Sequence, residues 1–249
     1  MNREHPYTIA APSFVWPARV GDNCRRLEGM VDEVAIVFFE TQGCLEYTEK
    51  DLPPDLARLD LTYHVHLPLD LPWTRGAGEV HRLTQALAAK TDFLRPRGFV
   101  LHPPDNTEDL AQFIRLWSQS RQAEDLFVEN IQGNDLNAAW PVIRDSGCRV
   151  CLDLGHLLAF GQERLLETPG LLEQTGMLHL SAPGPSGEHE SLARLDAHGS
   201  RLLRHVLRNM PASSIVVLEL FHPEKLSESL DIFRARFRNG RSAQGESNP

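Results

Sequence analysis

Histidine, aspartate and glutamate recur along this chain at the ends of short apolar runs. Imidazole and carboxylate groups together suit Zn, Mn, Fe or Co, whereas sites built only of oxygen suit Mg or Ca. Charged side chains are rarely buried unless they are paired or bind metal, so seven consecutive runs that end this way predict one shared metal site. The residues at these ends are Glu40, His64, His66, His102, Glu129, Asp153, His179 and Glu219.

Further polar residues follow two of these ends. Asp153-Leu-Gly-His156 is the most informative local pattern, because it places an imidazole one tight turn after a carboxylate. Glu188 and His189 follow the seventh run. His64 is the weakest ligand candidate, and we expect it either to support a ligand or simply to be hydrogen-bonded.

The apolar runs predict an α/β fold. They are short and rich in β-branched and aromatic residues, which is typical of strands buried on both faces. Between them lie stretches with one apolar face at helical spacing, which predict helices at 109–119, 200–209 and 227–237. The eight predicted strands cover residues 7–11, 33–39, 61–67, 98–102, 126–129, 149–153, 177–180 and 215–219.

Eight strands alternating with helices in 249 residues fit a closed (β/α)8 TIM barrel or an open doubly wound sheet. No Gly-x-Gly-x-x-Gly follows the first strand, so we favour the barrel. The carboxyl ends of barrel strands open on one face, so ligands far apart in sequence would converge there. We expect one barrel domain over residues 1–238 and a disordered tail over the polar residues 239–249.

Charge and composition limit the classes of partner that the protein is expected to bind. The chain has 25 Lys and Arg against 34 Asp and Glu, a net charge of −9, and no basic run. Nucleic-acid binding needs a basic surface that displaces counterions, so we expect no nucleic-acid partner. The N-terminus lacks a signal-peptide pattern, and no stretch approaches the ~20 apolar residues of a membrane span. We therefore predict a soluble cytoplasmic protein with no membrane partner; the sequence does not predict its oligomeric state.

The cysteines and the remaining histidines are predicted to be structural. Four scattered cysteines imply no disulfide scaffold and favour a reducing compartment. Cys148 and Cys151 have redox-motif spacing, but residues three apart on a strand point to opposite faces, so we expect structural thiols in the core or at the sheet edge. The histidines outside the strand-end pattern are expected at the surface, and these are His5, His81, His198, His205 and His222.

Several local sequences resemble those of the xylose isomerase-like barrel superfamily, which includes AP endonuclease family 2. The resemblance covers about residues 7–230. The matching segments are His-Leu-Pro at 66–68, Leu-His-Pro at 101–103, Val-Glu-Asn at 128–130, Cys-Leu-Asp-Leu-Gly-His at 151–156, Leu-His-Leu at 178–180, His-Glu-Ser-Leu at 189–192 and Leu-Glu at 218–219. The resemblance implies one to three divalent ions, Mn²⁺ or Zn²⁺. The implied ligands are His66, His102, Glu129, Asp153, His156, His179, His189 and Glu219.

Three other stretches are most similar to the cobamide-remodelling phosphodiesterases. They are residues 12–17 (Pro-Ser-Phe-Val-Trp-Pro), 31–40 and 64–71. Members of that family cleave a phosphoester in the nucleotide loop of adenosylated B12-type corrinoids. The resemblance therefore implies a corrinoid substrate, with Glu129 and Glu219 in bridging or acid–base roles. Ser13, Glu40, His64 and Glu188 are the implied contacts to substrate or to the ligands.

One position departs from the superfamily pattern. The three-metal endonucleases carry Asp-x-His after the seventh strand, but here Gly187 occupies the aspartate position and Glu188 precedes His189. This favours one or two ions, unless Glu188 substitutes. A metal-dependent sugar isomerase or epimerase, with Glu129 and Glu219 as a proton-transferring pair, is the alternative function. Abasic-site endonuclease activity and a non-enzymatic corrinoid- or metal-binding role are further alternatives.

Overall fold

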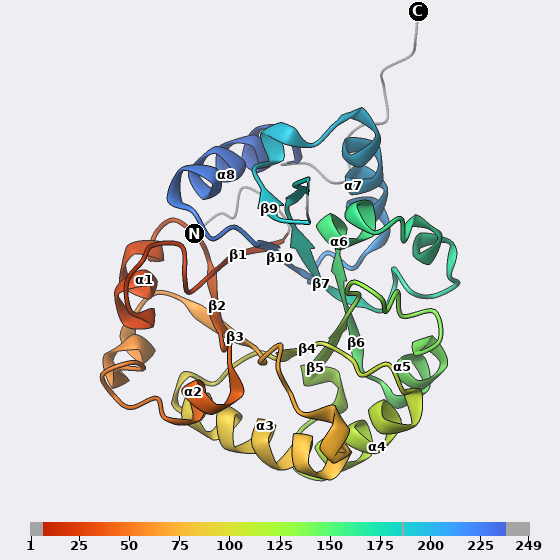
Figure 1. Ribbon diagram of the computed structural model, residues 1–249. Helices are drawn as coiled ribbons and strands as arrows, with labels where there is room; N and C mark the ends of the chain where they lie inside the picture. Colours follow the sequence, from red (N-terminus) through yellow and green to blue (C-terminus); the bar gives the residue numbers. More distant parts are fainter. Residues whose placement is uncertain (1–6, 186, 238–249) are drawn as a thin grey trace, which may run out of the picture.

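The computed structural model describes residues 7–185 and 187–237. The predicted tail and His5 lie outside these residues. Eight parallel strands form a closed barrel in the order β1-β10-β7-β6-β5-β4-β3-β2, and helices surround it (Figure 1). The prediction of a (β/α)8 TIM barrel is confirmed. The barrel strands are β1 (Thr8–Pro12), β2 (Glu33–Val37), β3 (Thr62–His66), β4 (Phe99–Leu101), β5 (Leu126–Glu129), β6 (Arg149–Asp153), β7 (Thr175–Leu180) and β10 (Ile215–Leu218).

The helices follow the strands along the chain. The three predicted helices are present, each beginning a few residues earlier than expected, and the long helix α3 was not among them. The α-helices are α1 (Val20–Leu27), α2 (Thr41–Leu45), α3 (Ala77–Thr91), α4 (Thr107–Trp117), α5 (Trp140–Ser146), α6 (Leu154–Ala159), α7 (Ala197–Asn209) and α8 (Pro223–Phe237). Short 3-10 helices occupy Pro54–Arg58, Trp73–Arg75, Asp92–Leu94, Ala123–Asp125, Glu163–Glu167 and Leu192–Arg194.

The hydrophobic core has two layers because strand side chains alternate between the two faces of the sheet. Val65 and Leu67 pack in the outer layer, between the strands and the helices, as predicted. Cys148 lies in the outer layer and Cys151 in the inner one, and both are free thiols, so the prediction of structural cysteines on opposite faces is confirmed. The inner cluster comprises Ala10, Val100, Phe127, Cys151, Met177, Ile215 and Val217.

Strand register aligns the carboxyl ends that carry the polar residues. Asp153 on β6 pairs with His179 on β7, and Val37 on β2 pairs with His66 on β3. Several helices begin directly at this end, where an acidic or amide side chain caps the first turn. Asp153 caps α6 by accepting from the backbone N–H of His156 at 2.6 Å. The Asp-Leu-Gly-His pattern is therefore a strand end joined directly to a helix start.

A small hairpin departs from the predicted β/α alternation. Its antiparallel strands, β8 (Ala182–Pro183) and β9 (His189–Glu190), follow β7 at the carboxyl end of the barrel. The strands are two residues long, which is too short for apolar periodicity to reveal them. His189 owes its position to this hairpin and not to a barrel strand.

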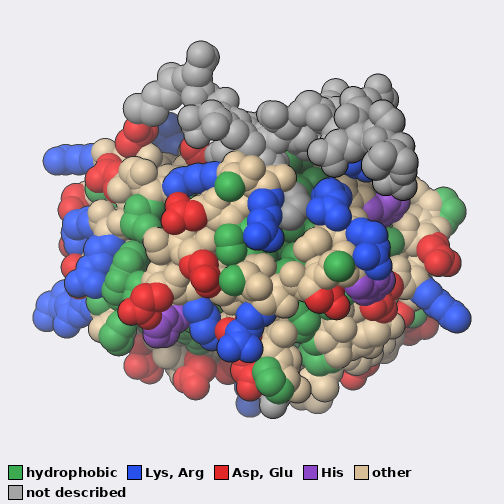
Figure 2. Space-filling view, turned by 90° about the horizontal axis from the view of Figure 1, so that it is seen from above, with side chains coloured by type: hydrophobic (Ala, Val, Ile, Leu, Met, Phe, Trp, Pro, Cys, Tyr) green, Lys and Arg blue, Asp and Glu red, His purple; other side chains and the backbone are tan. Residues whose placement is uncertain are grey.

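Most of the histidines that were predicted to lie at the surface are exposed. His198 and His222 have side chains more than half exposed, and His205 is exposed. The surface prediction is wrong for His81. This side chain is half-buried and packs edge-on against Phe113, with ring centroids 6.2 Å apart. On the face shown in Figure 2, basic and acidic side chains are interspersed. Among the described residues, no helix is long and apolar enough to cross a membrane.

Candidate metal centre

Glu129, at the end of β5, lies at the centre of a buried group of histidines. Its Oε2 atom lies 3.2 Å from Nε2 of His66 and 3.1 Å from Nε2 of His102. Its other oxygen, Oε1, lies 3.1 Å from Nδ1 of His179. The two oxygens of this carboxylate therefore face two different sets of imidazoles. A carboxylate placed in this way can bridge two cations.

A second set of ligand atoms surrounds Oε1 of Glu129. Donor atoms of Glu129, Asp153, His179 and Glu219 all lie within 4.8 Å of one another, and all four residues are buried. Glu219 Oε2 is 3.0 Å from Nδ1 of His179 without the alignment of a hydrogen bond. Among the described residues, Oδ2 of Asp153 also has no hydrogen-bond partner. Buried carboxylate oxygens left unsatisfied are costly, and a bound cation would satisfy both.

The hydrogen bonds of three histidines fix which ring nitrogen carries the proton when the ring is neutral. Nδ1 of His66 donates to the carbonyl of Leu67 at 2.9 Å, which in a neutral ring leaves Nε2 as an acceptor. That acceptor faces another acceptor, Oε2 of Glu129, so a proton or a cation must lie between them. Nδ1 of His156 likewise donates to the carbonyl of Asn130, and Nδ1 of His189 donates to the carbonyl of Glu219. Metal-binding histidines characteristically use one nitrogen in this way and bind with the other.

The charges of this group shift the pKa values of its members in both directions. Burial raises the pKa of Asp153 to about 6, although the neighbouring His156 opposes the shift. Burial would lower the pKa of His179, but Cys151 and the carboxylates of Glu219 and Glu129 raise it well above its ordinary value. Burial would raise the pKa of Glu129, yet the adjacent histidines hold it well below its usual range. Without a cation, protons must balance three converging carboxylates.

Asn130 and Gln162 hold Asp153 and His156 in place. The Asn130 amide accepts from the backbone N–H of Asp153 at 2.7 Å and donates to its carbonyl at 3.0 Å. It also donates to Gln162 Oε1 at 3.0 Å, and Gln162 in turn donates to the carbonyl of Ile131 at 2.8 Å. Gln162 was missed from the sequence, and Asn130 entered only as part of the Val-Glu-Asn match. The strand-end pattern considered acidic and imidazole groups alone.

Gly155 allows the backbone to approach this site closely. A Cβ atom at this position would lie 2.5 Å from Oγ of Ser181 and 3.2 Å from Oδ1 of Asp153. Any side chain at 155 would therefore displace the hydroxyl of Ser181 and crowd the carboxylate that caps α6. The glycine in Asp-Leu-Gly-His is a packing requirement of the site.

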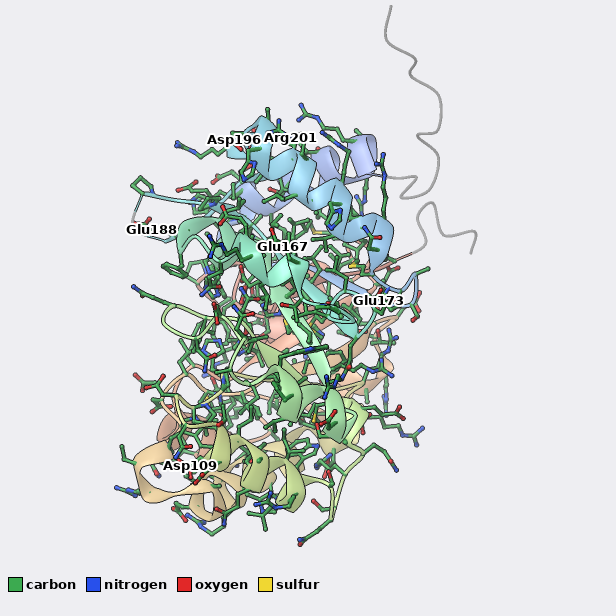
Figure 3. The ribbon with its side chains drawn as sticks, turned by 90° about the vertical axis from the view of Figure 1, so that its right-hand side faces the viewer. Asp109, Glu167, Glu173, Glu188, Asp196 and Arg201 are labelled. Carbon is green, nitrogen blue, oxygen red and sulfur yellow. The ribbon has the colours of Figure 1, made fainter. Side chains whose placement is uncertain are left out.

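The hairpin brings His189 to the site but not Glu188. Nδ1 of His189 lies 3.6 Å from Oε2 of Glu219. Oε2 of Glu188 instead lies over Gly184, where an added Cβ would be 2.6 Å away. Figure 3 shows Glu188 at the same end of the molecule as Asp109 of α4 and far from Glu173, which precedes β7. Gly187, at the expected aspartate position, has φ +84°, which disfavours any residue with a side chain.

Three predicted contact residues lie outside the ligand group. His64 is fully buried inside the barrel, and its Nδ1 contacts Oε1 of Glu33 at 2.7 Å, which agrees with its expected hydrogen-bonded role. Ser13 is buried, and its hydroxyl accepts from the backbone N–H of Val37 at 3.1 Å. Glu40 is exposed and precedes α2 without capping it through its side chain. Contacts of Ser13 and Glu40 with a substrate remain predictions.

Comparison with known proteins shows which solved structures have a similar fold. No protein-family model matches the sequence, and no curated protein matches it significantly. Among solved structures, a D-tagatose 3-epimerase-like protein superimposes with a TM-score of 0.73 at 15% identity, covering 95% of this chain and 100% of the other. The probable 3-DHS dehydratase AsbF from Bacillus anthracis gives 0.67 at 11% identity, covering 92% and 99%. A protein from Thermus thermophilus, soaked with ZnCl2, gives 0.61 at 20% identity, covering 97% and 100%.

These similarities agree with the closed (β/α)8 barrel fold of this chain. At such low identities the fold is all that they establish for this chain. The donor set of the site, with its unsatisfied buried oxygens, fits a divalent cation independently of these neighbours.

Proposed function

We propose that this protein is a metal-dependent phosphodiesterase. The observation that carries the proposal is the position of Glu129, whose two oxygens face the His66–His102 pair and His179 respectively. Two cations held on either side of this carboxylate would stabilise the charge on the oxygens of a phosphoester during cleavage. A single ion would occupy only one of the two donor groups that share Glu129.

The residues divide into two ligand sets that share Glu129. His66 and His102 belong to the first set, and Asp153, His179 and Glu219 to the second. His156 and His189 flank the second set, with Nδ1 of His156 3.8 Å from Oε1 of Glu129 and Nδ1 of His189 3.6 Å from Oε2 of Glu219, and each Nδ1 also donates to a backbone carbonyl. Mn²⁺ and Zn²⁺ both suit this mixture of nitrogen and oxygen donors.

The proposed substrate is a cobamide, cleaved in its nucleotide loop. Its support is the similarity of residues 12–17, 31–40 and 64–71 to cobamide-remodelling phosphodiesterases. Each of these stretches includes the carboxyl end of a barrel strand or the loop after it, so all three reach the face that carries the metal centre. The named structural neighbours do not support this substrate.

The test measures metal content and cleavage on the same sample. Purified protein is analysed for bound metals and then incubated with adenosylcobalamin and Mn²⁺ or Zn²⁺, with products separated by chromatography. We expect a phosphorylated corrinoid that lacks its lower-ligand riboside, and no product with the Glu129→Gln variant. An unchanged chromatogram under every metal would refute the proposal.

A metal-dependent sugar isomerase or epimerase is the second candidate, and the names of the structural neighbours favour it over the first. Its supporting geometry is the compact second ligand set, in which Glu129 and Glu219 both approach Nδ1 of His179, at 3.1 and 3.0 Å. Two carboxylates that converge at one point could transfer a proton between adjacent carbons of a ketose. One bound ion per chain, interconversion of ketoses and no phosphoester cleavage would favour this candidate.

A further inference from the structure

His189 is held in place differently from every other candidate ligand. The others lie on a barrel strand or within three residues of its carboxyl end, so the barrel itself fixes their positions. His189 lies on β9, in a hairpin whose two strands have two residues each. A two-stranded hairpin is at best marginally stable in water unless it packs against a helix or a further strand. Contacts from outside the hairpin must therefore keep His189 beside Glu219, where its Nδ1 lies 3.6 Å from Oε2.

The first turn of α8 supplies one such contact. In Figure 1, β9 lies between α8 and α6. Nζ of Lys225, in the first turn of α8, lies 3.0 Å from Oε1 of Glu190 and donates to the carbonyl of His189 at 3.4 Å. One side chain of α8 therefore reaches both the backbone of the candidate ligand and the carboxylate of the next residue.

A second group of hydrogen bonds joins α8 to the residues that follow β9. The buried Ser229 hydroxyl accepts from the backbone N–H of Leu192 at 3.0 Å and donates to Oγ of Ser191 at 3.3 Å. The Ser191 hydroxyl in turn donates to Oε2 of Glu228. Glu228 and Ser229 are three and four residues after Lys225, so the three side chains share one face of α8. This face holds the chain both at the hairpin and directly after it.

The position of Lys225 indicates a role beyond neutralising Glu190. The first turn of a helix carries the positive end of its dipole, where a cation is unfavourable. Glu190 already has a second cation, Arg194, whose Nε lies 3.5 Å from Oε2 and whose side chain is 69% exposed. Arg194 belongs to the segment after the hairpin, so its ion pair does not join the hairpin to another element. Lys225 makes that connection, because it comes from α8 and reaches the carbonyl of His189.

We propose that Lys225 is a positioning residue of the metal centre, which fixes His189 beside Glu219 by holding the hairpin against α8. The inference rests on the proposed metal-dependent activity and adds a residue that acts on the second ligand set through His189. Nδ1 of His189 donates to the carbonyl of Glu219 at 2.8 Å, so a hairpin that moved away from α8 would break this bond and shift the imidazole. Metal affinity depends on ligand positions within tenths of an ångström and on the groups that orient the ligands.

The experiment measures Zn²⁺ affinity by calorimetry on chelator-treated, full-length protein. The variant is Lys225→Met, which removes the ammonium group and keeps an unbranched side chain. Arg194→Met is the matched control, because it removes the other cation at Glu190 and leaves α8 unchanged. Lys225→Arg is the conservative variant, which retains a charged donor. Ser229→Ala is a second variant that weakens the connection to α8 at another point, and thermal melting checks that each variant folds.

We expect Lys225→Met to bind Zn²⁺ about tenfold more weakly, and Arg194→Met and Lys225→Arg to bind as the wild type does. Ser229→Ala should also weaken binding. The loss caused by Lys225→Met should disappear in a His189→Gln background, because the effect of Lys225 passes through that side chain. An equal loss in both backgrounds would show a merely structural role and overturn the inference. Wild-type affinity in Lys225→Met, or in His189→Gln alone, would overturn it as well.

A readout without metal follows the Nδ1 proton of His189 by NMR. Because this proton is donated to the Glu219 carbonyl, it should give a downfield resonance that is absent from His189→Gln. We expect Lys225→Met to lose this resonance and Arg194→Met to keep it, and its retention in both would contradict the positioning role.

Hydrolysis of bis(4-nitrophenyl) phosphate with Mn²⁺ is measured separately as a readout of phosphodiesterase chemistry. No hydrolysis together with the expected pattern of Zn²⁺ affinities would refute the proposed phosphodiesterase alone. Hydrolysis together with unchanged Zn²⁺ affinity in Lys225→Met would refute the positioning role alone.

Discussion

Two polar clusters are buried inside this barrel, and they differ in how their charges are satisfied. In the lower cluster, at the start of β2, Oε1 of Glu33 contacts His64 at 2.7 Å. Oε2 of Glu33 accepts hydrogen bonds from the side chains of Thr62 at 2.7 Å and Arg97 at 3.0 Å. In the upper cluster, at the carboxyl ends of the strands, Asp153 Oδ2 and Glu219 Oε2 have no hydrogen-bond partner among the described residues.

The difference shows how a structural ion pair can be told from a metal site. One buried carboxylate in the lower cluster is matched by a guanidinium and an imidazole from the protein itself. Three carboxylates converge in the upper cluster, and histidines neutralise them only if they take up protons. Both clusters contain buried carboxylates and imidazoles, so the deciding observation is whether carboxylate oxygens are left without a donor.

Removing the bridging charge of the upper cluster should have the largest effect. We expect Glu129→Gln to lower kcat/KM by about 10³-fold and to reduce bound metal, because it removes the carboxylate shared by both ligand sets. Steady-state kinetics and elemental analysis measure the two effects. Wild-type activity and metal content in this variant would contradict the assignment of Glu129 as a bridge.

The corresponding change in the lower cluster should affect stability and not metal. Glu33→Gln leaves His64 and Arg97 without their carboxylate, and we expect a loss of about 3 kcal/mol in the free energy of unfolding. Denaturant titration measures this loss, while elemental analysis of the folded fraction should match the wild type. Loss of metal in Glu33→Gln would show that the two clusters are not independent.

Asp153, His66 and His179 of the upper cluster should give a dependence of stability on pH opposite to that of Glu33 in the lower cluster. The pKa of Asp153 is raised to about 6, so its contribution to stability is present below about pH 4 and is lost as pH rises through 6. The raised pKa values of His66 and His179 extend this loss above pH 6.5. Burial opposes ionisation of Glu33, but His64, Thr62 and Arg97 lower its pKa below 4.5, so its contribution is lost only as pH falls below that value.

Thermal melting of chelator-treated protein measures these slopes. We expect the melting temperature to fall between pH 6 and pH 8 and to be restored by Mn²⁺ or Zn²⁺, because a cation replaces the protons that balance the upper cluster. The Glu33→Gln variant should show a smaller decline below pH 4.5, where Glu129 and Glu219 with their lowered pKa values still contribute, and should keep the decline above pH 6. A metal-free protein whose stability rises from pH 6 to pH 8 would contradict the account of the upper cluster.

The smallest effect, a loss of metal affinity, is expected from substituting the residues that position the candidate ligands. Asn130→Ala removes the amide that holds both backbone groups of Asp153, and we expect metal affinity to fall by about 10- to 100-fold. Glu188→Gln is the matched comparison at this end of the barrel, and we expect less than about a threefold change because its carboxylate lies over Gly184. Metal titration by calorimetry measures both variants. A larger loss in Glu188→Gln would show that Glu188 replaces the missing aspartate ligand.

The sequence predicted the barrel and the polar residues at the strand ends because both depend on short-range patterns. Buried parallel strands are continuous apolar runs, and a polar residue at the end of each run is visible without any tertiary information. The fold prediction followed from the regular alternation of these runs with helices. The two-residue strands of the hairpin carry no such pattern, so the position of His189 beside Glu219 could not be derived from it.

What the sequence alone determined is the fold and the set of residues that could bind a cation. The closed barrel decided which of them meet, because strand register places Asp153 beside His179 and the interior alternation places His64 below the ligand group, against Glu33. Barrel closure also places the His66–His102 pair at one oxygen of Glu129 and His179 at the other. It brings Phe14, Phe39 and Phe221 into a row beside them. These relations join residues from different strands and loops, and their distances are fixed only when the barrel closes.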